Sequence, residues 1–250
     1  MSKQAHLTAD DVQTLDNVFE AHRLPPVTRR ALLATAAGAA GVAAVAGVPG
    51  LAAAANASAV KEVGTAAITA EAMAVTYLSH LIKKDGHAFP MSTAQVLKAA
   101  NAAEQDHYLA LRSLGFKPLT KKFWIPDAAF SAKKAPPIIE YLESVFVNAY
   151  LIGTTTFAAA GNSDGARYTV EIGAVEAEHR TLARALQGKL PDNLAFTSYT
   201  VKTIPQIVAA IEKLGIGFGK QTHAPGRFYT YSGPLPGTTT GLTTRKPDQV

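Results

Sequence analysis

Residues 102–114 read AAEQDHYLALRSL, and residues 174–186 read AVEAEHRTLARAL. Ala, Glu, His, Arg and Leu recur at the same places in the two segments. Each segment therefore carries one Glu-x-x-His pair: Glu104 with His107, and Glu176 with His179. The offset between the two pairs is 72 residues.

A further glutamate stands 33 residues before each pair, at Glu71 and at Glu143. These two residues are also 72 residues apart. One offset shared by four glutamates and two histidines indicates an internal repeat. It predicts two similar helix pairs that face each other around a common site.

The spacing within each pair suits a metal ion. Residues at i and i+3 leave the same face of a helix, so one carboxylate and one imidazole can reach the same point. Two such pairs, with one Glu from each of two further helices, form the ligand set of di-iron and di-manganese helical bundles. The chain has no Cys, and carboxylates with imidazoles suit iron or manganese. We therefore expect two Fe ions or two Mn ions as the cofactor.

Each of the four glutamates interrupts an apolar helix face; around Glu71, for example, that face contains Ala67, Val75 and Leu78. A buried carboxylate without a partner costs several kcal/mol, so it takes up a proton or binds a cation. Two divalent ions would also remove the repulsion among four converging carboxylates. The predicted metal ligands are Glu71, Glu104, His107, Glu143, Glu176 and His179.

The helical angles of other polar residues near these positions indicate whether they face the ligands. Asp106, Glu178 and His80 point away from the ligands and are expected at the surface. Glu140 lies close to the face of Glu143 and is the best substitute ligand. Tyr108 and Tyr150 share faces with Glu104 and Glu143. They are expected to be core aromatics with a polar tip, the alternative being hydrogen-bond donors or redox-active residues beside the metals.

The six-ligand pattern resembles the ferritin-like superfamily, which includes bacterioferritin and rubrerythrin. The nearest resemblance is to exported ferritin-like domain proteins related to desiccation-induced proteins, over residues 57–190. It implies that Glu104 and Glu176 bridge the two metals and are the catalytic residues. Glu71 with His107 would complete one metal, and Glu143 with His179 the other. The segment after residue 190 lacks the ending of a cage-forming subunit, which puts iron storage in doubt.

The resemblance and the helical pattern together predict an all-α chain whose core is a ferritin-like four-helix bundle at residues 56–190. The expected helices are 57–84, 92–115, 136–161 and 162–188, with a short C-terminal helix at 204–215. Ser92 or Thr93 is expected to cap the second helix and Gly115 to end it, and Asn162–Asp164 to begin the fourth. The link at 116–134 lacks helical periodicity, and its roughly 20 residues reach about 66 Å when extended. A long crossover between the second and third helices is therefore expected. Residues 191–250 otherwise form an irregular tail, in which Phe228, Tyr229 and Tyr231 dock on the bundle or on a partner subunit.

The N-terminal region predicts export. Residues 28–33 read TRRALL, and an uncharged, Ala- and Gly-rich stretch follows from Ala31 to Ala55. Paired arginines before a weakly hydrophobic core are typical of a twin-arginine signal, here residues 1–55, with an A-x-A motif at 53–55. Cleavage near Ala55 is favoured over retention as an anchor. The twin-arginine machinery would then be a partner, and the periplasm, cell envelope or extracellular space the destination.

The formal net charge of +5 is spread diffusely along the chain, without a basic stripe interleaved with aromatics. A nucleic-acid partner is therefore not expected. The first functional hypothesis is a di-iron redox enzyme that reacts with O2 or hydrogen peroxide and oxidises Fe(II) or another external reductant. The second is a di-manganese protein that disproportionates peroxide. The third is a structural stress protein with a vestigial metal site. A homodimer is one expected assembly.

Overall fold

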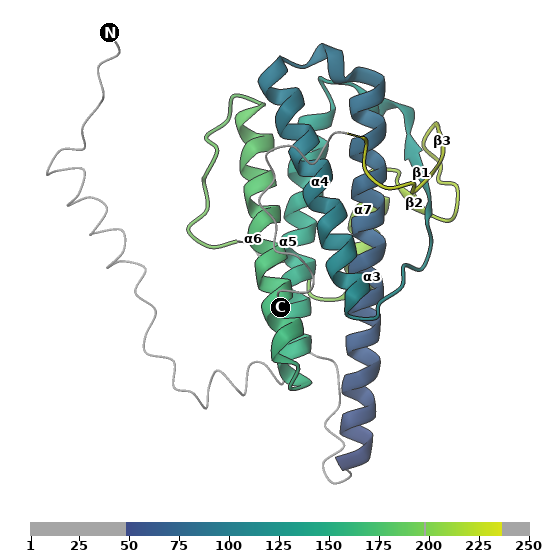
Figure 1. Ribbon diagram of the computed structural model, residues 1–250, viewed down its shortest axis with the longest axis vertical. Coiled ribbons are helices and arrows are strands. Elements are labelled where there is room, and N and C mark those ends of the chain that lie inside the picture. The colour runs from purple at the N-terminus through teal and green to yellow at the C-terminus, as the bar shows by residue number, and fades with distance from the viewer. Residues whose placement is uncertain (1–48, 198, 237–250) are drawn as a thin grey trace, which may run out of the picture. The chain divides into compact units, whose positions relative to one another are not determined.

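The computed structural model describes residues 49–197 and 199–236. Its main body is a bundle of four long helices (Figure 1), namely α3 (Pro49–Asp85), α4 (Met91–Ser113), α5 (Ala135–Ala159) and α6 (Ser163–Ala185). Short links make α3 and α4, and likewise α5 and α6, antiparallel neighbours. The segment between α4 and α5 runs along the outside of the bundle (Figure 1). The predicted mainly helical bundle with a long crossover is confirmed at this level.

The ends of the helices follow local chemistry. Asn162 caps α6, because its side-chain oxygen accepts a hydrogen bond from the Gly165 amide at 2.8 Å. Gly115 follows α4 with φ of 90°, the left-handed conformation that glycine adopts without strain. The prediction that Ser92 or Thr93 caps α4 was wrong. The Ala94 amide donates to the Pro90 carbonyl at 3.0 Å, so the helix begins directly after the proline.

The helix α3 begins at Pro49, earlier than the predicted start at Ala57. The A-x-A motif at 53–55 therefore lies in helical backbone. The rest of the predicted twin-arginine signal, residues 1–48, lies outside the described residues, as does the end of the tail from residue 237. Among the helices of the described ranges, none has the length and apolarity needed to cross a membrane.

A small sheet lies beside the helices, so the prediction of an all-α chain was incomplete. Strand β1 (Lys122–Pro126), in the crossover, pairs antiparallel with β2 (Gly217–Phe218) and with β3 (Gly226–Thr230), in the order β2-β1-β3. The crossover and the tail were expected to be irregular. Each strand is short and finds its partner about 100 residues away, so no local alternation marks it as part of a sheet.

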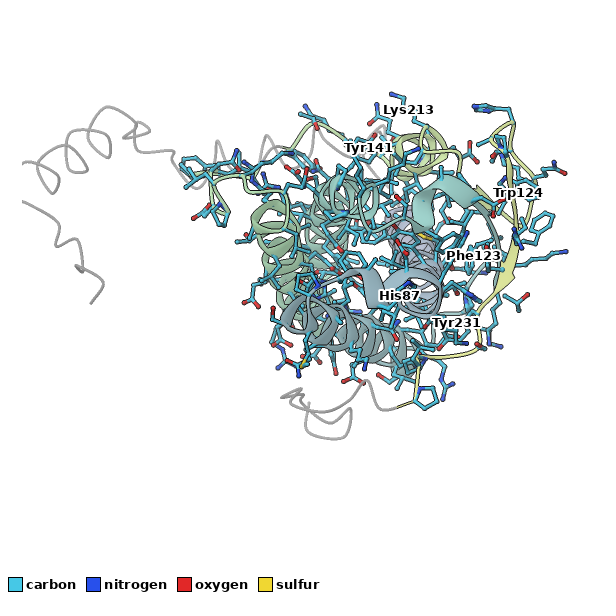
Figure 2. All side chains as sticks on the ribbon, turned by 90° about the horizontal axis from the view of Figure 1, so that it is seen from above. His87, Phe123, Trp124, Tyr141, Lys213 and Tyr231 are labelled. Carbon is cyan, nitrogen blue, oxygen red and sulfur yellow. The ribbon has the colours of Figure 1, made fainter. Side chains whose placement is uncertain are left out.

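The sheet covers one flank of the bundle (Figure 2). Phe123 is fully buried and Trp124 is 8% exposed, and the Trp124 indole N–H donates to the Ala224 carbonyl at 3.0 Å. Tyr229 and Tyr231 of the tail dock on the bundle, whereas the Phe228 ring lies 5.2 Å from the Trp124 ring of β1. The Tyr229 ring lies 4.5 Å from the ring of His80. His80 is thus half-buried beneath the tail, and its predicted place at the surface was wrong.

Two further contacts attach the C-terminal part of the chain to the bundle. The Tyr231 ring lies 4.7 Å from the Tyr108 ring, and its hydroxyl bonds to the Gln105 side chain at 2.7 Å. The predicted C-terminal helix is present as α7 (Ile204–Glu212) and is capped by Thr203. It packs against α5 and α3 through Ile207 and Ile211, both buried.

Candidate metal centre

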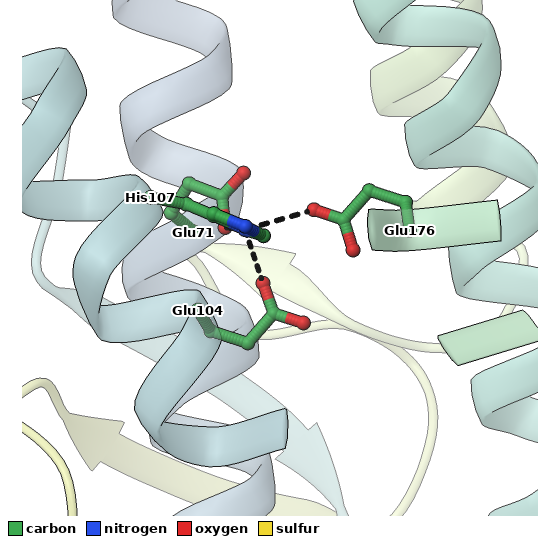
Figure 3. Close-up of side chains that lie close together, drawn as sticks. All are labelled: Glu71, Glu104, His107 and Glu176. Carbon is green, nitrogen blue, oxygen red and sulfur yellow. Dashed lines mark ion pairs between the residues drawn. The ribbon is translucent and has the colours of Figure 1, made fainter. Parts of the chain in front are cut away.

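The bundle brings all six predicted ligands together in its interior. Glu71 comes from α3, Glu143 from α5, and each of the other two helices contributes a Glu-x-x-His pair. Every member is at most 8% exposed, and Glu104 and Glu176 are fully buried. Figure 3 shows the half that contains Glu71 and His107, with side chains from three helices converging on one point. The sequence repeat therefore corresponds to a shared site.

The donor atoms form two overlapping sets, in each of which they all lie within 4.8 Å of one another. The first set contains Glu71, Glu104, His107 and Glu176; the second contains Glu104, Glu143, Glu176 and His179. Each set could hold a metal ion. Glu104 and Glu176 belong to both sets, so these two carboxylates lie between the two positions that an ion could take.

The spacing of the donors suits coordination. His107 Nδ1 lies 3.2 Å from a Glu176 oxygen and 3.5 Å from a Glu104 oxygen. His179 Nδ1 lies 3.0 Å from Glu104 and 3.2 Å from Glu176. Two ligand atoms that bind the same ion at about 2.1 Å, with an angle of about 90° at the ion, lie about 3 Å apart. Both imidazoles therefore present Nδ1 at a distance that one ion could bridge.

Several of these atoms lack a hydrogen bond within the described part of the protein. They are Glu71 Oε2, both oxygens of Glu104, His107 Nδ1, Glu143 Oε2 and Glu176 Oε1. The nearest groups are other members of the cluster, at distances or angles that do not make good hydrogen bonds. Unpaired buried polar atoms are rare because each costs free energy. Bound cations would give these six atoms the partners that they lack.

Burial and mutual charge govern the protonation of the cluster. Burial raises the pKa of Glu71 well above its ordinary value, and the charges of Glu104 and Glu176 raise it further. Burial and the same two charges raise the pKa of Glu143. Burial also opposes ionisation of Glu104, but the adjacent imidazoles of His107 and His179 outweigh it and lower the pKa of that carboxyl.

The histidines are held in their charged form by the carboxylates. Burial disfavours the His179 imidazolium, yet Glu104 and Glu176 outweigh burial and raise its pKa to about 10. The pKa of His107 is likewise raised against burial, chiefly by the charge of Glu176. Burial and the Glu104 charge disfavour ionisation of Glu176, but the nearby charge of His107 lowers its pKa.

These directions give a neutral cluster when it holds only protons. They favour carboxylates at Glu104 and Glu176, imidazolium ions at His107 and His179, and neutral acids at Glu71 and Glu143. Four carboxylates with two divalent cations and two neutral imidazoles would carry the same net charge. The buried site can thus exchange protons for cations without acquiring a net charge, which a low-dielectric interior would penalise.

One contributor to the site was underestimated from sequence. The Tyr150 hydroxyl donates a hydrogen bond to the Glu71 carboxylate, and the ring is 4% exposed. For Tyr150 the favoured prediction was a core aromatic and the alternative was a hydrogen-bond donor beside the ligands; the structure supports the alternative. Tyr108 on α4 packs instead on Tyr231 of the tail, away from the carboxylates.

The remaining polar candidates lie outside the donor sets. Glu178 is exposed, as predicted, whereas Asp106 is half-buried. Glu140 is not a substitute ligand, because it bonds to Arg184, Gln187 and Lys189, in and just after the last turn of α6. Partial burial opposes its ionisation, but these three partners lower its pKa to about 2.

No protein-family model, curated protein or solved structure matches this chain. The chemistry of the site therefore rests on its residues.

Proposed function

We propose that this protein is a ferritin-like di-metal carboxylate protein that oxidises Fe(II), or another small reductant, with O2 or hydrogen peroxide. The observation that carries the proposal is the pair of four-donor sets that share Glu104 and Glu176. A pair of redox-active ions bound there would supply electrons to the oxidant. With O2, two Fe(II) and two protons would give two Fe(III) and one H2O2, so atoms and charge balance.

The side chains have distinct roles in this proposal. Glu104 and Glu176, placed between both positions, are the carboxylates best able to bridge two ions and to adjust as their charge changes. Glu71 with His107, and Glu143 with His179, would complete one position each. The Tyr150 hydroxyl orients the Glu71 carboxylate and can hold a proton there. Burial of the cluster limits access of bulk water to the bound ions.

Manganese is the second candidate metal, because a set of carboxylate and imidazole donors suits both ions. With manganese, the proposed reaction is disproportionation of two H2O2 to O2 and two H2O. The reductant and oxidant are then the same molecule, and no external electron donor is needed.

The first test is metal content by plasma mass spectrometry, on protein isolated as expressed and after reconstitution with Fe(II) or Mn(II). We expect about two ions per chain in the parent protein. The double variant Glu104→Gln/Glu176→Gln should lose them. The matched control is Glu178→Gln, an exposed glutamate on the same helix as Glu176. Absence of metal in the parent protein after reconstitution would sink both redox proposals and leave a structural stress protein.

The second test separates the two metals. O2 consumption on addition of Fe(II) is the expected activity of the iron form, and O2 evolution from H2O2 that of the manganese form. Both should disappear in the double variant and persist in Glu178→Gln.

Export through the twin-arginine pathway remains part of the proposal and rests on the paired arginines at positions 29 and 30. Fractionation of cells should find the chain outside the cytoplasm. The Arg29→Lys/Arg30→Lys variant should be retained inside. Equal distribution of the two forms would contradict this route.

A further inference from the structure

A small cavity leads from the surface between α4 and α6 to one end of the metal centre. Its volume is about 20 Å³, which is close to the room that one water-sized molecule needs. Glu143 and His179 line it, and the other described residues of its lining are apolar. Leu182 and Leu186, also in its lining, are 41% and 38% exposed, so the cavity has an apolar mouth on the protein surface.

The 72-residue repeat allows this half of the site to be compared with the other. Four residues of the cavity lining correspond to a larger residue in the opposite half: Leu78 to Tyr150, Val96 to Tyr168, Ala100 to Ile172, and Ala183 to Leu111. The difference runs the other way at three lining positions, where Leu97, Ile139 and Leu182 correspond to Thr169, Ala67 and Ala110. The four larger residues are 4%, 8%, 4% and 1% exposed, so they fill the interior on their side. In addition, the Tyr150 hydroxyl bonds to Glu71 there. The two halves have equivalent ligands but different surroundings.

The apolar lining also favours entry of apolar molecules over polar or charged ones. A hydrated cation would lose its water shell among leucine and alanine side chains, which costs a large free energy. Hydrogen peroxide would lose hydrogen bonds to water for the same reason. Dioxygen is small and apolar and loses neither.

We propose that this cavity admits dioxygen to the Glu143–His179 half of the centre, while Tyr150, Ile172 and Leu111 close the Glu71–His107 half to it. The proposal rests on the proposed function, which it deepens by naming O2 as the oxidant and one side as its route. Fe(II) then reaches the centre by another path. The asymmetry makes Glu143 and His179 the ligands nearest to the arriving oxidant.

The route can be measured without turnover. Dissolved O2 is paramagnetic and speeds the relaxation of methyl groups that it approaches. We expect the effect to be several-fold larger at the Leu78 methyls than at those of Leu111, in the full-length chain with labelled methyl groups and diamagnetic Zn(II) added. Both leucines are buried, at 4% and 1% exposure, so they form a matched pair. Equal effects, or a larger effect at Leu111, would overturn the proposal.

A variant tests whether the route serves the reaction. Ala100 is half-buried and lines the cavity, and its counterpart in the opposite half is Ile172. Ala100→Ile therefore introduces the side chain of the opposite half into the cavity. It should reduce the O2 effect at Leu78 to the level of Leu111 and slow Fe(II) oxidation several-fold. The control Ala177→Ile adds the same bulk at an exposed position of α6 and should change neither. Should Ala100→Ile not fold, Leu182→Ala at the mouth should increase the effect at Leu78, and no increase would count against the route.

The outcomes separate the two proposals. Unchanged Fe(II) oxidation in an Ala100→Ile protein that has lost the Leu78 effect would overturn the access route and leave the redox function standing. A Leu78 effect that persists in Ala100→Ile would also overturn the route. Preferential O2 access without any Fe(II) oxidation would overturn the redox function instead.

Discussion

The hydroxyl of Tyr150 on α5 donates a hydrogen bond to the carboxylate of Glu71 on α3. Its counterpart in the repeat is Leu78, which has no hydroxyl to offer Glu143. The contact therefore distinguishes two otherwise equivalent halves of the centre. It links α5 to α3, and it holds Glu71 in place by a hydrogen bond that Leu78 cannot provide to Glu143.

Tyr150→Phe should weaken metal binding at the Glu71–His107 position. Loss of a hydrogen bond that orients a ligand typically costs about 10–100-fold in metal affinity. Titration of the metal-free protein should then show one weakened and one unchanged site. Tyr108→Phe is the matched control, since that ring lies against Tyr231 rather than the ligands. Equal weakening in both variants would argue against an orienting role for Tyr150.

Metal binding should release protons. Near neutral pH the raised pKa values of Glu71, Glu143, His107 and His179 keep these four groups protonated. Two divalent ions would displace them, which gives about four protons per chain. Calorimetry in buffers of different ionisation enthalpy counts the protons directly. A release near zero would show that the ligands are already ionised and that the charge balance inferred for the cluster is wrong.

The stability of the metal-free protein should fall as the pH rises. His179 has a folded pKa of about 10, above its ordinary value of 6.5. A raised pKa means that the folded state binds the proton more tightly, so the stabilisation is complete below about pH 6.5 and is lost towards pH 10. Thermal melts in chelator should show this decline, with a shallower slope in His179→Gln. Identical slopes in the two proteins would exclude His179 as the cause.

Attachment of the tail should depend on Asn101. This fully buried side chain donates to the Val75 carbonyl at 3.0 Å, and its oxygen accepts from the Leu235 amide at 3.1 Å. Asn101→Ala leaves buried groups unpaired, so we expect a loss of about 2–3 kcal/mol in the free energy of unfolding. Urea titration measures it, with the exposed Lys98→Ala on the same helix as the control. A loss as small as that of the control would mean that the tail contributes little.

Local sequence patterns predicted much of the bundle. Asn162 and Gly115 marked helix ends because capping and left-handed φ depend on neighbouring residues. The strand pairing was not predictable in this way. Phe123 pairs with Tyr229 and Phe218, far along the chain, and such register depends on the packing of the whole flank. The half-burial of His80 under Tyr229 follows from the same docking.

The sequence by itself determined the six candidate ligands, because one 72-residue offset and the i, i+3 spacing fix which side chains share a helix face. Only the tertiary structure decided that Glu104 and Glu176 belong to both donor sets. It also decided that Tyr150 reaches Glu71 rather than a residue on its own helix, and that a small cavity reaches Glu143 and His179. Helical periodicity orients a side chain about its own axis, whereas contacts across the bundle depend on how four helices pack at native density.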